Sequence, residues 1–118
     1  MSSMVERSVA PSGTGCVECD AQASWWFHLR RCAECGHIGC CDSSLNRHAT
    51  AHANATGHKI MRSFEPGEDG FWDYSTAAFV DEPELEPPLS HPLDQTVPGP
   101  AERVPADWQE QLAARSGQ

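Results

Sequence analysis

The sequence predicts a small α+β domain that is stabilised by two zinc ions. Pairs of the form C-x-x-C begin at Cys16 and Cys32, and an H-x-x-x-H pair follows at His48 and His52. Tetrahedral zinc takes four sulfur or nitrogen ligands, and a C-x-x-C pair can bind one ion from a tight turn. Two such pairs followed by paired histidines therefore indicate two metal sites. Alternating apolar residues predict a strand, and the spacing of the histidines predicts a helix.

Length and cysteine content limit the class of protein. A chain of 118 residues holds at most one ordinary domain, and so small a core is marginal unless it is cross-linked. The N-terminal stretch has no apolar signal region, and no apolar run is as long as a membrane span. We therefore expect a soluble cytoplasmic protein with no membrane partner, in which the six cysteines bind metal rather than form disulfides.

The charge of the chain is concentrated in its second half. Residues 1–63 carry six Lys or Arg and five Asp or Glu, whereas residues 64–118 carry two and twelve. Nonspecific binding to nucleic acid depends on neutralising phosphates, so this balance argues against a nucleic-acid partner. It also predicts a solvated tail.

Three segments follow from the composition. Residues 1–12 are expected to be a disordered lead-in, and residues 13–75 hold the metal-binding domain. Residues 76–118 form an acidic, proline-rich tail, which we expect to be mostly disordered because it cannot offset the entropy of ordering. A short helix is expected within the tail at residues 106–114.

Residues 25–30 alternate as a half-buried strand does. Successive side chains of a strand point to opposite faces. One face is then formed by Trp25, Phe27 and Leu29, and the other by Trp26, His28 and Arg30. The first set is the natural core face, so we expect Trp26 and Arg30 on the outer face.

A helix and a strand follow this segment. Asp42, Ser43 and Ser44 are plausible N-caps for a helix of about ten residues that carries both histidines. Gly57 is expected to end the helix, and a strand is expected from His58 to Phe64.

One grouping of the ligands points to DNA recognition. Cys32, Cys35, His48 and His52 have the spacing of the two-Cys, two-His finger. This grouping leaves Cys16 without a partner site, and the chain is acidic. A nucleic-acid-binding finger is therefore the least favoured alternative.

The longer pattern resembles the UBP-type zinc finger of ubiquitin-specific proteases, which also occurs in stand-alone prokaryotic proteins. The resemblance covers residues 13–75 and rests on C-V-E-C, W-F-H-L-R-R-C-A-E-C-G-H, H-A-T-A-H, T-G-H and F-W-D-Y. It implies a twisted antiparallel sheet, a histidine-bearing helix and two interleaved zinc sites. The tail composition and the C-C-D-S-S loop add the expectation of a prokaryotic origin. Carried over, the first site is Cys16, Cys19, Cys40 and His48, and the second is Cys32, Cys35, His52 and His58.

The doublet Cys40–Cys41 leaves one thiol over. Spacing from Cys35 favours Cys40 as the ligand, whereas spacing back from His48 favours Cys41. We choose Cys40 and keep Cys41 as the alternative. His37 is expected beside the metal sites and not as a ligand, since both sites are already full.

The resemblance implies a protein-interaction module. Relatives hold a free carboxyl-terminal Gly-Gly between aromatic walls, and the matching residues here are Trp26, Trp72 and Tyr74, with Arg30 as the candidate partner of the carboxylate. Asp42 departs from an Arg that ubiquitin binders often place there. Saturated zinc sites and the lack of a zinc-hydrolase motif predict a non-enzyme, expected to be a monomer that binds a protein or peptide C-terminus. The alternative is a purely structural accessory zinc domain.

Overall fold

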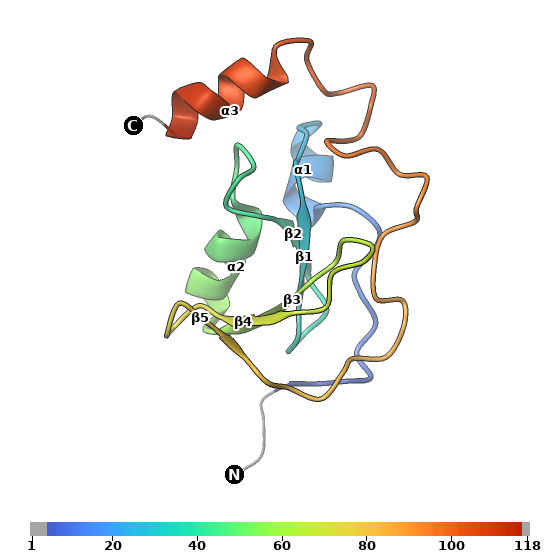
Figure 1. Cartoon of the computed structure of the whole chain (residues 1–118), viewed down its shortest axis with the longest axis vertical. Helices are drawn as coiled ribbons and strands as arrows, with labels where there is room; N and C mark the ends of the chain where they lie inside the picture. Colours follow the sequence, from blue (N-terminus) through green and yellow to red (C-terminus); the bar gives the residue numbers. More distant parts are fainter. Residues whose placement is uncertain (1–4, 117–118) are drawn as a thin grey trace.

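The computed structural model describes residues 5–116, which form a single antiparallel sheet with two helices against it and a third near the C-terminus (Figure 1). The strand order is β2-β1-β3-β4-β5. The strands are β1 (Leu29–Cys32), β2 (Ile38–Cys40), β3 (Ile60–Ser63), β4 (Phe71–Asp73) and β5 (Ala78–Val80). The helices are α1 (Val17–Gln22), α2 (His48–Thr56) and α3 (Trp108–Ser116). The α+β class with a histidine-bearing helix is confirmed.

The register of the sheet separates its two faces. Arg30 pairs with Ser63, and Met61 pairs with Trp72, so these side chains lie on one face, here called the front face. Leu29 and Arg31 point to the opposite face, where both are almost fully buried. We call this the back face.

The second C-x-x-C pair forms the turn between β1 and β2. Gly36 follows this pair with a φ of 83°, a conformation that glycine adopts without steric cost. A Cβ at Gly36 would also come within 2.1 Å of the carbonyl oxygen of Ala10. The turn therefore needs glycine both for its own shape and for the approach of the N-terminal segment.

The helices differ from the sequence prediction at their starts. The expected N-caps at Asp42, Ser43 and Ser44 are wrong, because α2 begins at His48 and its N-cap Arg47 has a φ of 50° without a side-chain cap. The Ser44 hydroxyl instead accepts a hydrogen bond from the amide of Phe27 at 2.8 Å. Gly57 ends α2 with a φ of 81°, as expected.

The first helix was not predicted. It begins after Cys16, whose sulfur accepts a hydrogen bond from the amide of Cys19 at 3.4 Å. The first C-x-x-C pair is therefore the start of a helix of six residues rather than an isolated turn.

Two apolar clusters pack against the sheet. The first packs Leu29, Ile38 and Phe64 around the first group of cysteines and Trp26. The second joins Val5, Ala33, Ile60, Phe71 and Leu85. The second cluster thus draws on both ends of the chain, with Val5 from the N-terminal segment and Leu85 from beyond β5.

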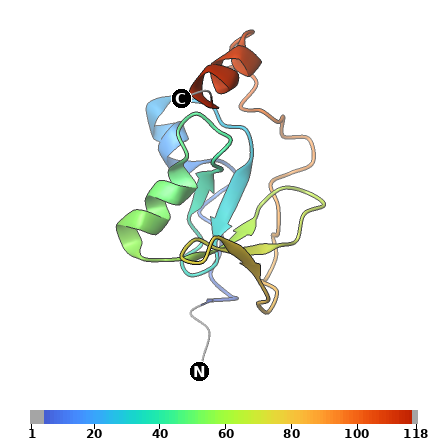
Figure 2. The ribbon, with the colours of Figure 1, turned by 60° about the vertical axis from the view of Figure 1, so that its left-hand side comes forward.

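The C-terminal segment follows the back face of the sheet and runs along the side of the molecule away from α2 (Figure 2). Arg31, 1% exposed, donates to the carbonyl oxygens of Glu86 at 3.0 Å and Pro88 at 2.8 Å. Arg62 binds both carboxylate oxygens of Glu84, at 2.6 and 2.9 Å. Residues 84–91, here called the strap, therefore meet two arginines that lie within the sheet.

Further contacts hold the end of the strap and the chain that follows it. The imidazole of His91 in the strap lies 2.8 Å from the Glu65 carboxylate, and both side chains are buried. Gly99 and Trp26 then exchange two backbone hydrogen bonds, at 2.9 and 3.0 Å. The flexibility expected for most of residues 76–118 stays a prediction. Residues 1–4 of the expected lead-in lie outside the described part of the chain.

Candidate metal centres

The first cluster of metal ligands comes from three elements. Cys16 and Cys19 belong to the start of α1, Cys40 ends β2 and His48 begins α2. The His48 Nδ1 atom lies 3.2 Å from the Cys16 sulfur, 3.3 Å from the Cys19 sulfur and 3.6 Å from the Cys40 sulfur. Zn–S bonds of about 2.3 Å and Zn–N bonds of about 2.0 Å put tetrahedral ligands about 3.6 to 3.8 Å apart. The four atoms therefore fit one zinc ion.

Hydrogen bonds from nitrogen support the sulfurs of this site. The amide of His48 donates to the Cys40 sulfur at 3.2 Å, and the Asn46 side chain donates to the Cys19 sulfur at 3.6 Å. Such donors favour the thiolate form that zinc binds. All three cysteines are buried, so this site is shielded from solvent.

The second cluster lies one turn further along α2 and is more open. Its four ligands are Cys32, Cys35, His52 and His58, whose ligand atoms lie within 4.8 Å of one another. The Cys35 sulfur is 3.3 Å from the His52 Nε2 atom, and Cys35 is exposed. Burial, together with nearby His37 and His58, lowers the pKa of His52, which favours the neutral imidazole that zinc requires.

Histidines and cysteines outside the clusters have other contacts. His37 binds the Glu18 carboxylate at 2.8 Å and stacks on His52 with ring centroids 4.0 Å apart. The Cys41 sulfur lies 3.6 Å from the Ser44 hydroxyl and takes no part in either cluster. Burial acts to raise the pKa of the Cys41 thiol, but hydrogen bonds from His28 and Ser44 outweigh it and lower the pKa to about 7. The structure therefore places Cys40, and not Cys41, in the cluster that fits the first zinc ion.

The two sites are interleaved along the chain. Each takes one C-x-x-C pair and one histidine of α2, since His48 belongs to the first site and His52 to the second.

Residues 16–85, more than half of the chain, match the family described as "Zn-finger in ubiquitin-hydrolases and other protein". The chain belongs to this UBP-type zinc-finger family. The family is a zinc-finger module and is not itself catalytic, and both clusters of this finger fit zinc.

A solved structure agrees with this assignment. The finger is similar to protein RPA1320 from Rhodopseudomonas palustris, a structure determined by solution NMR. The two share 41% sequence identity over 78% of this chain and 86% of the other, with a TM-score of 0.61. A comparison with curated proteins found no match.

A groove of about 640 Å³ opens on the front face of the sheet beside the loop after β2. Three residues predicted for peptide binding line it, namely Arg30, Trp72 and Tyr74. Other lining residues were missed by the sequence analysis, among them Met61 and Phe79. Phe79 belongs to β5, a strand of three residues without a clear alternating signal.

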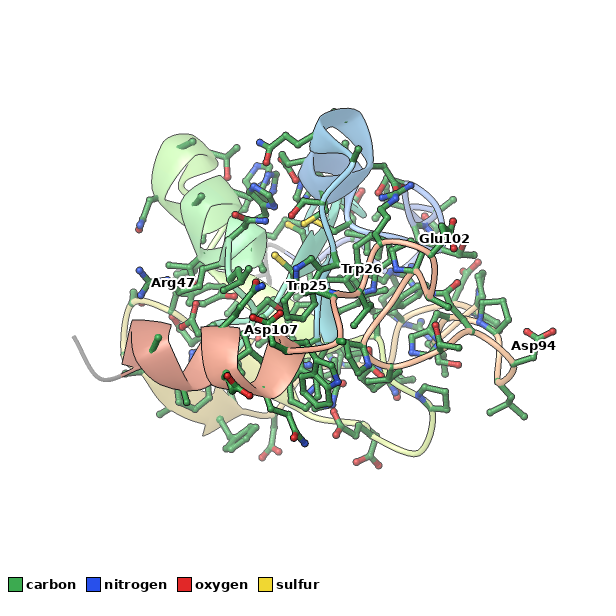
Figure 3. All side chains as sticks on the ribbon, turned by 90° about the horizontal axis from the view of Figure 1, so that it is seen from above. Trp25, Trp26, Arg47, Asp94, Glu102 and Asp107 are labelled. Carbon is green, nitrogen blue, oxygen red and sulfur yellow. The ribbon has the colours of Figure 1, made fainter. Side chains whose placement is uncertain are left out.

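The fourth predicted residue, Trp26, does not line the groove. The expectation that it faces outward is wrong, because only 3% of Trp26 is exposed. Its ring packs over Gly15, where a Cβ would come within 2.7 Å of it, and Figure 3 shows it close to the C-terminal segment. The strand β1 begins at Leu29, so the alternation does not extend back to Trp26.

Charges around the groove are mixed. Arg30 is 21% exposed, and its Nη1 atom donates to the carbonyl oxygen of Leu29 at 3.1 Å. Burial raises the pKa of Tyr74 to about 12, and nearby Asp42 adds to this rise while Thr50 opposes it. The phenol of Tyr74 is therefore neutral at physiological pH and can donate a hydrogen bond.

The described residues include no helix that is both long and apolar enough to cross a membrane.

Proposed function

We propose that this zinc finger is a protein-interaction module whose groove binds the free carboxyl terminus of a peptide. The observation that carries the proposal is the meeting of Arg30, Trp72 and Tyr74 in one groove of about 640 Å³. This volume is in the range of ligand pockets, which combine apolar walls with a few polar groups that fix orientation.

Each of the three residues has a part in the proposal. Flat aromatic walls admit a glycine backbone more readily than a branched side chain, so Trp72 and Tyr74 favour an unbranched terminus. Arg30 supplies a guanidinium whose planar donors match the two oxygens of a carboxylate. Only one of its nitrogens donates to the main chain at Leu29, which leaves others for a ligand.

Asp42 argues against ubiquitin as the partner. Its carboxylate lines the same groove and accepts a hydrogen bond from the Thr50 hydroxyl. A carboxylate near the incoming terminus repels it, and a charge left without its partner typically costs a few kcal/mol. We therefore expect ubiquitin to bind weakly or not at all.

Calorimetric titration tests the proposal with a free peptide ending in Gly-Gly, its amidated form and ubiquitin. The free peptide should bind at least tenfold more tightly than the amidated one. The variant Arg30→Gln should remove this difference, whereas Arg103→Gln, a change of another arginine that does not line the groove, should keep it. Equal binding of the free and amidated peptides would exclude capture of the carboxylate, and micromolar binding of ubiquitin would show that Asp42 matters less than proposed.

A further inference from the structure

We infer that the Cys32–Cys35 pair of the second metal site is an oxidation site for peroxides, with Cys35 as the sulfur that reacts first. The product is a disulfide within the C-x-x-C turn, formed with release of the zinc ion from this site. The inference concerns the thiols of the second site and does not depend on what the groove binds.

The two metal sites differ in how far their sulfurs are shielded. Cys16, Cys19 and Cys40 of the first site are 0% exposed, and Cys32 of the second site is 5% exposed. Cys35 is the one exposed cysteine among the six of the chain, all of which the structure describes. An oxidant in solution therefore reaches Cys35 before the other ligand sulfurs, and oxidation of thiolates follows their exposure.

The histidine side of the second site is covered, which leaves Cys35 as its open corner. His37 stacks on His52 with ring centroids 4.0 Å apart, and the Glu18 carboxylate holds His37 at 2.8 Å. The His37 side chain is only 14% exposed in this position. The approach from solvent is therefore open at the sulfur and closed at the ring of His52.

Hydrogen bonds also distinguish Cys35 from the other ligand sulfurs. Each sulfur of the first site accepts a hydrogen bond from a nitrogen of the chain. The Cys32 sulfur accepts hydrogen bonds from the main-chain amides of Glu34 and Cys35. Within residues 5–116, the Cys35 sulfur receives no such amide and meets only Cys32 and the His52 Nε2 atom. A thiolate attacks through a lone pair, and at Cys35 no N–H group of the main chain occupies one.

Cys32 is placed to complete the reaction. It is the last residue of β1, and Cys35 follows in the turn, with the two sulfurs within 4.8 Å of each other. The amide of Gly36 donates to the carbonyl oxygen of Cys32 at 2.9 Å and holds the ends of this turn together. Neighbouring thiols in a C-x-x-C turn can close to the S–S distance of about 2.05 Å that a disulfide requires.

The reaction has two steps and consumes one peroxide. The Cys35 thiolate attacks one oxygen of hydrogen peroxide, the O–O bond breaks, and a sulfenic acid forms while hydroxide leaves. The Cys32 thiolate then attacks the Cys35 sulfur, the S–S bond forms, the S–O bond breaks, and a second hydroxide leaves. Two electrons have passed from the sulfurs to the peroxide. Only His52 and His58 then remain of the four ligands, too few for a structural zinc site.

Treatment of the zinc-loaded full chain with hydrogen peroxide tests the inference. A chromogenic chelator measures the release of zinc, and alkylation followed by tandem mass spectrometry identifies each oxidised cysteine. Zinc should leave in an initial phase of one ion per chain that matches the appearance of the Cys32–Cys35 disulfide. The other ion should leave about tenfold more slowly, because its three sulfurs are buried. Dithiothreitol and added zinc should restore the original mass.

Two substitutions identify the reactive sulfur. Cys35→His keeps a zinc ligand at this position but removes the thiol, so the initial phase should disappear. Cys41→Ser removes the one thiol that lies outside both clusters and should leave the initial phase unchanged. Native mass spectrometry before peroxide is added checks that each variant holds two zinc ions. If Cys35→His holds only one, the order in which the wild-type thiols become oxidised decides the question.

Three results would overturn the inference. Zinc could leave the two sites at equal rates, which would show that exposure of Cys35 does not direct the reaction. The first oxidised sulfur could be Cys41 or a cysteine of the first site. The initial phase could also persist in Cys35→His, in which case another sulfur starts the reaction.

Discussion

Two consecutive arginines show how differently the two faces of the sheet are used. Arg30 points to the front face and lines the open groove, where it is 21% exposed. Arg31 points to the back face, where it is 1% exposed and donates to main-chain carbonyls of Val9, Glu86 and Pro88. Identical side chains in adjacent positions therefore lie on two different surfaces, one open to solvent and one covered by the chain.

The chain outside the zinc sites closes one face of the sheet and leaves the other open. The back face is covered by both ends of the same chain, through Val5 and Leu85 in its apolar cluster and through the carbonyls bound to Arg31. No segment among the described residues covers the groove on the front face in this way. The back face is accordingly a source of stability, and the front face is the one available to a partner.

Loss of zinc should unfold the domain and so disrupt both faces of the sheet. This is the largest effect we expect. A domain of this size buries too little to fold alone, and structural zinc contributes about 10 kcal/mol or more. Native mass spectrometry should show two zinc ions in the wild type and in Cys41→Ser, and a lost zinc in Cys40→Ser. Loss from Cys41→Ser alone would move the ligand to Cys41, and a folded protein without zinc would refute the dependence.

Replacing the two arginines separately should distinguish the faces by stability. Arg31→Met would remove three hydrogen bonds of a buried guanidinium to main-chain carbonyls and should lower the free energy of unfolding by about 2 to 4 kcal/mol. Arg30→Met makes the same chemical change at a partly exposed site and should cost about 0.5 kcal/mol or less. Urea unfolding of the zinc-loaded proteins measures both free energies. Equal costs would show that the two arginines contribute equally to stability, which would contradict the proposed difference between the faces.

Hydrogen exchange should sharpen the account of the back face. Composition predicts flexibility over residues 82–105, yet three amides in this range donate to carbonyl oxygens earlier in the chain, those of Glu86, His91 and Gly99. We expect modest protection at these three amides and almost none at the other residues of the range that lack such bonds. Uniformly fast exchange would mean that the strap is open in solution, and strong protection throughout would contradict the expected flexibility.

The titration of Tyr74 tests the front face with the smallest change, because no residue is replaced. Tyr74 is the single tyrosine of the chain, so absorbance at the tyrosinate band reports it directly. Its pKa should lie near 12 in the folded protein and near the ordinary value of 10 after unfolding. Because the raised pKa belongs to the folded state, the stability that the neutral phenol contributes is complete below pH 10 and is lost as the pH rises from 10 to 12. A midpoint near 10 in the folded protein would mean that the tyrosine is solvated.

The sequence by itself determined the zinc chemistry and the family. The spacings from Cys16 to His58 are local, and a tetrahedral ion accepts only a few arrangements of such ligands, so two sites and the helix of His48 and His52 follow without knowledge of the fold. Alternation also placed Leu29 and Arg30 on opposite sides, as β1 shows. For those positions the local pattern and the final strand coincide.

Only the tertiary structure decided which surfaces are open. Trp26 has the same parity as Arg30, but it lies outside β1 and is buried through Gly15 and Gly99, contacts that no local pattern contains. The partners of Arg31 lie 22 to 57 positions away, and their carbonyl oxygens belong to every residue type alike. Metal ligands are recognisable because their chemistry is in the side chain, whereas Arg31 binds the strap through main-chain carbonyls, which have no sequence signature.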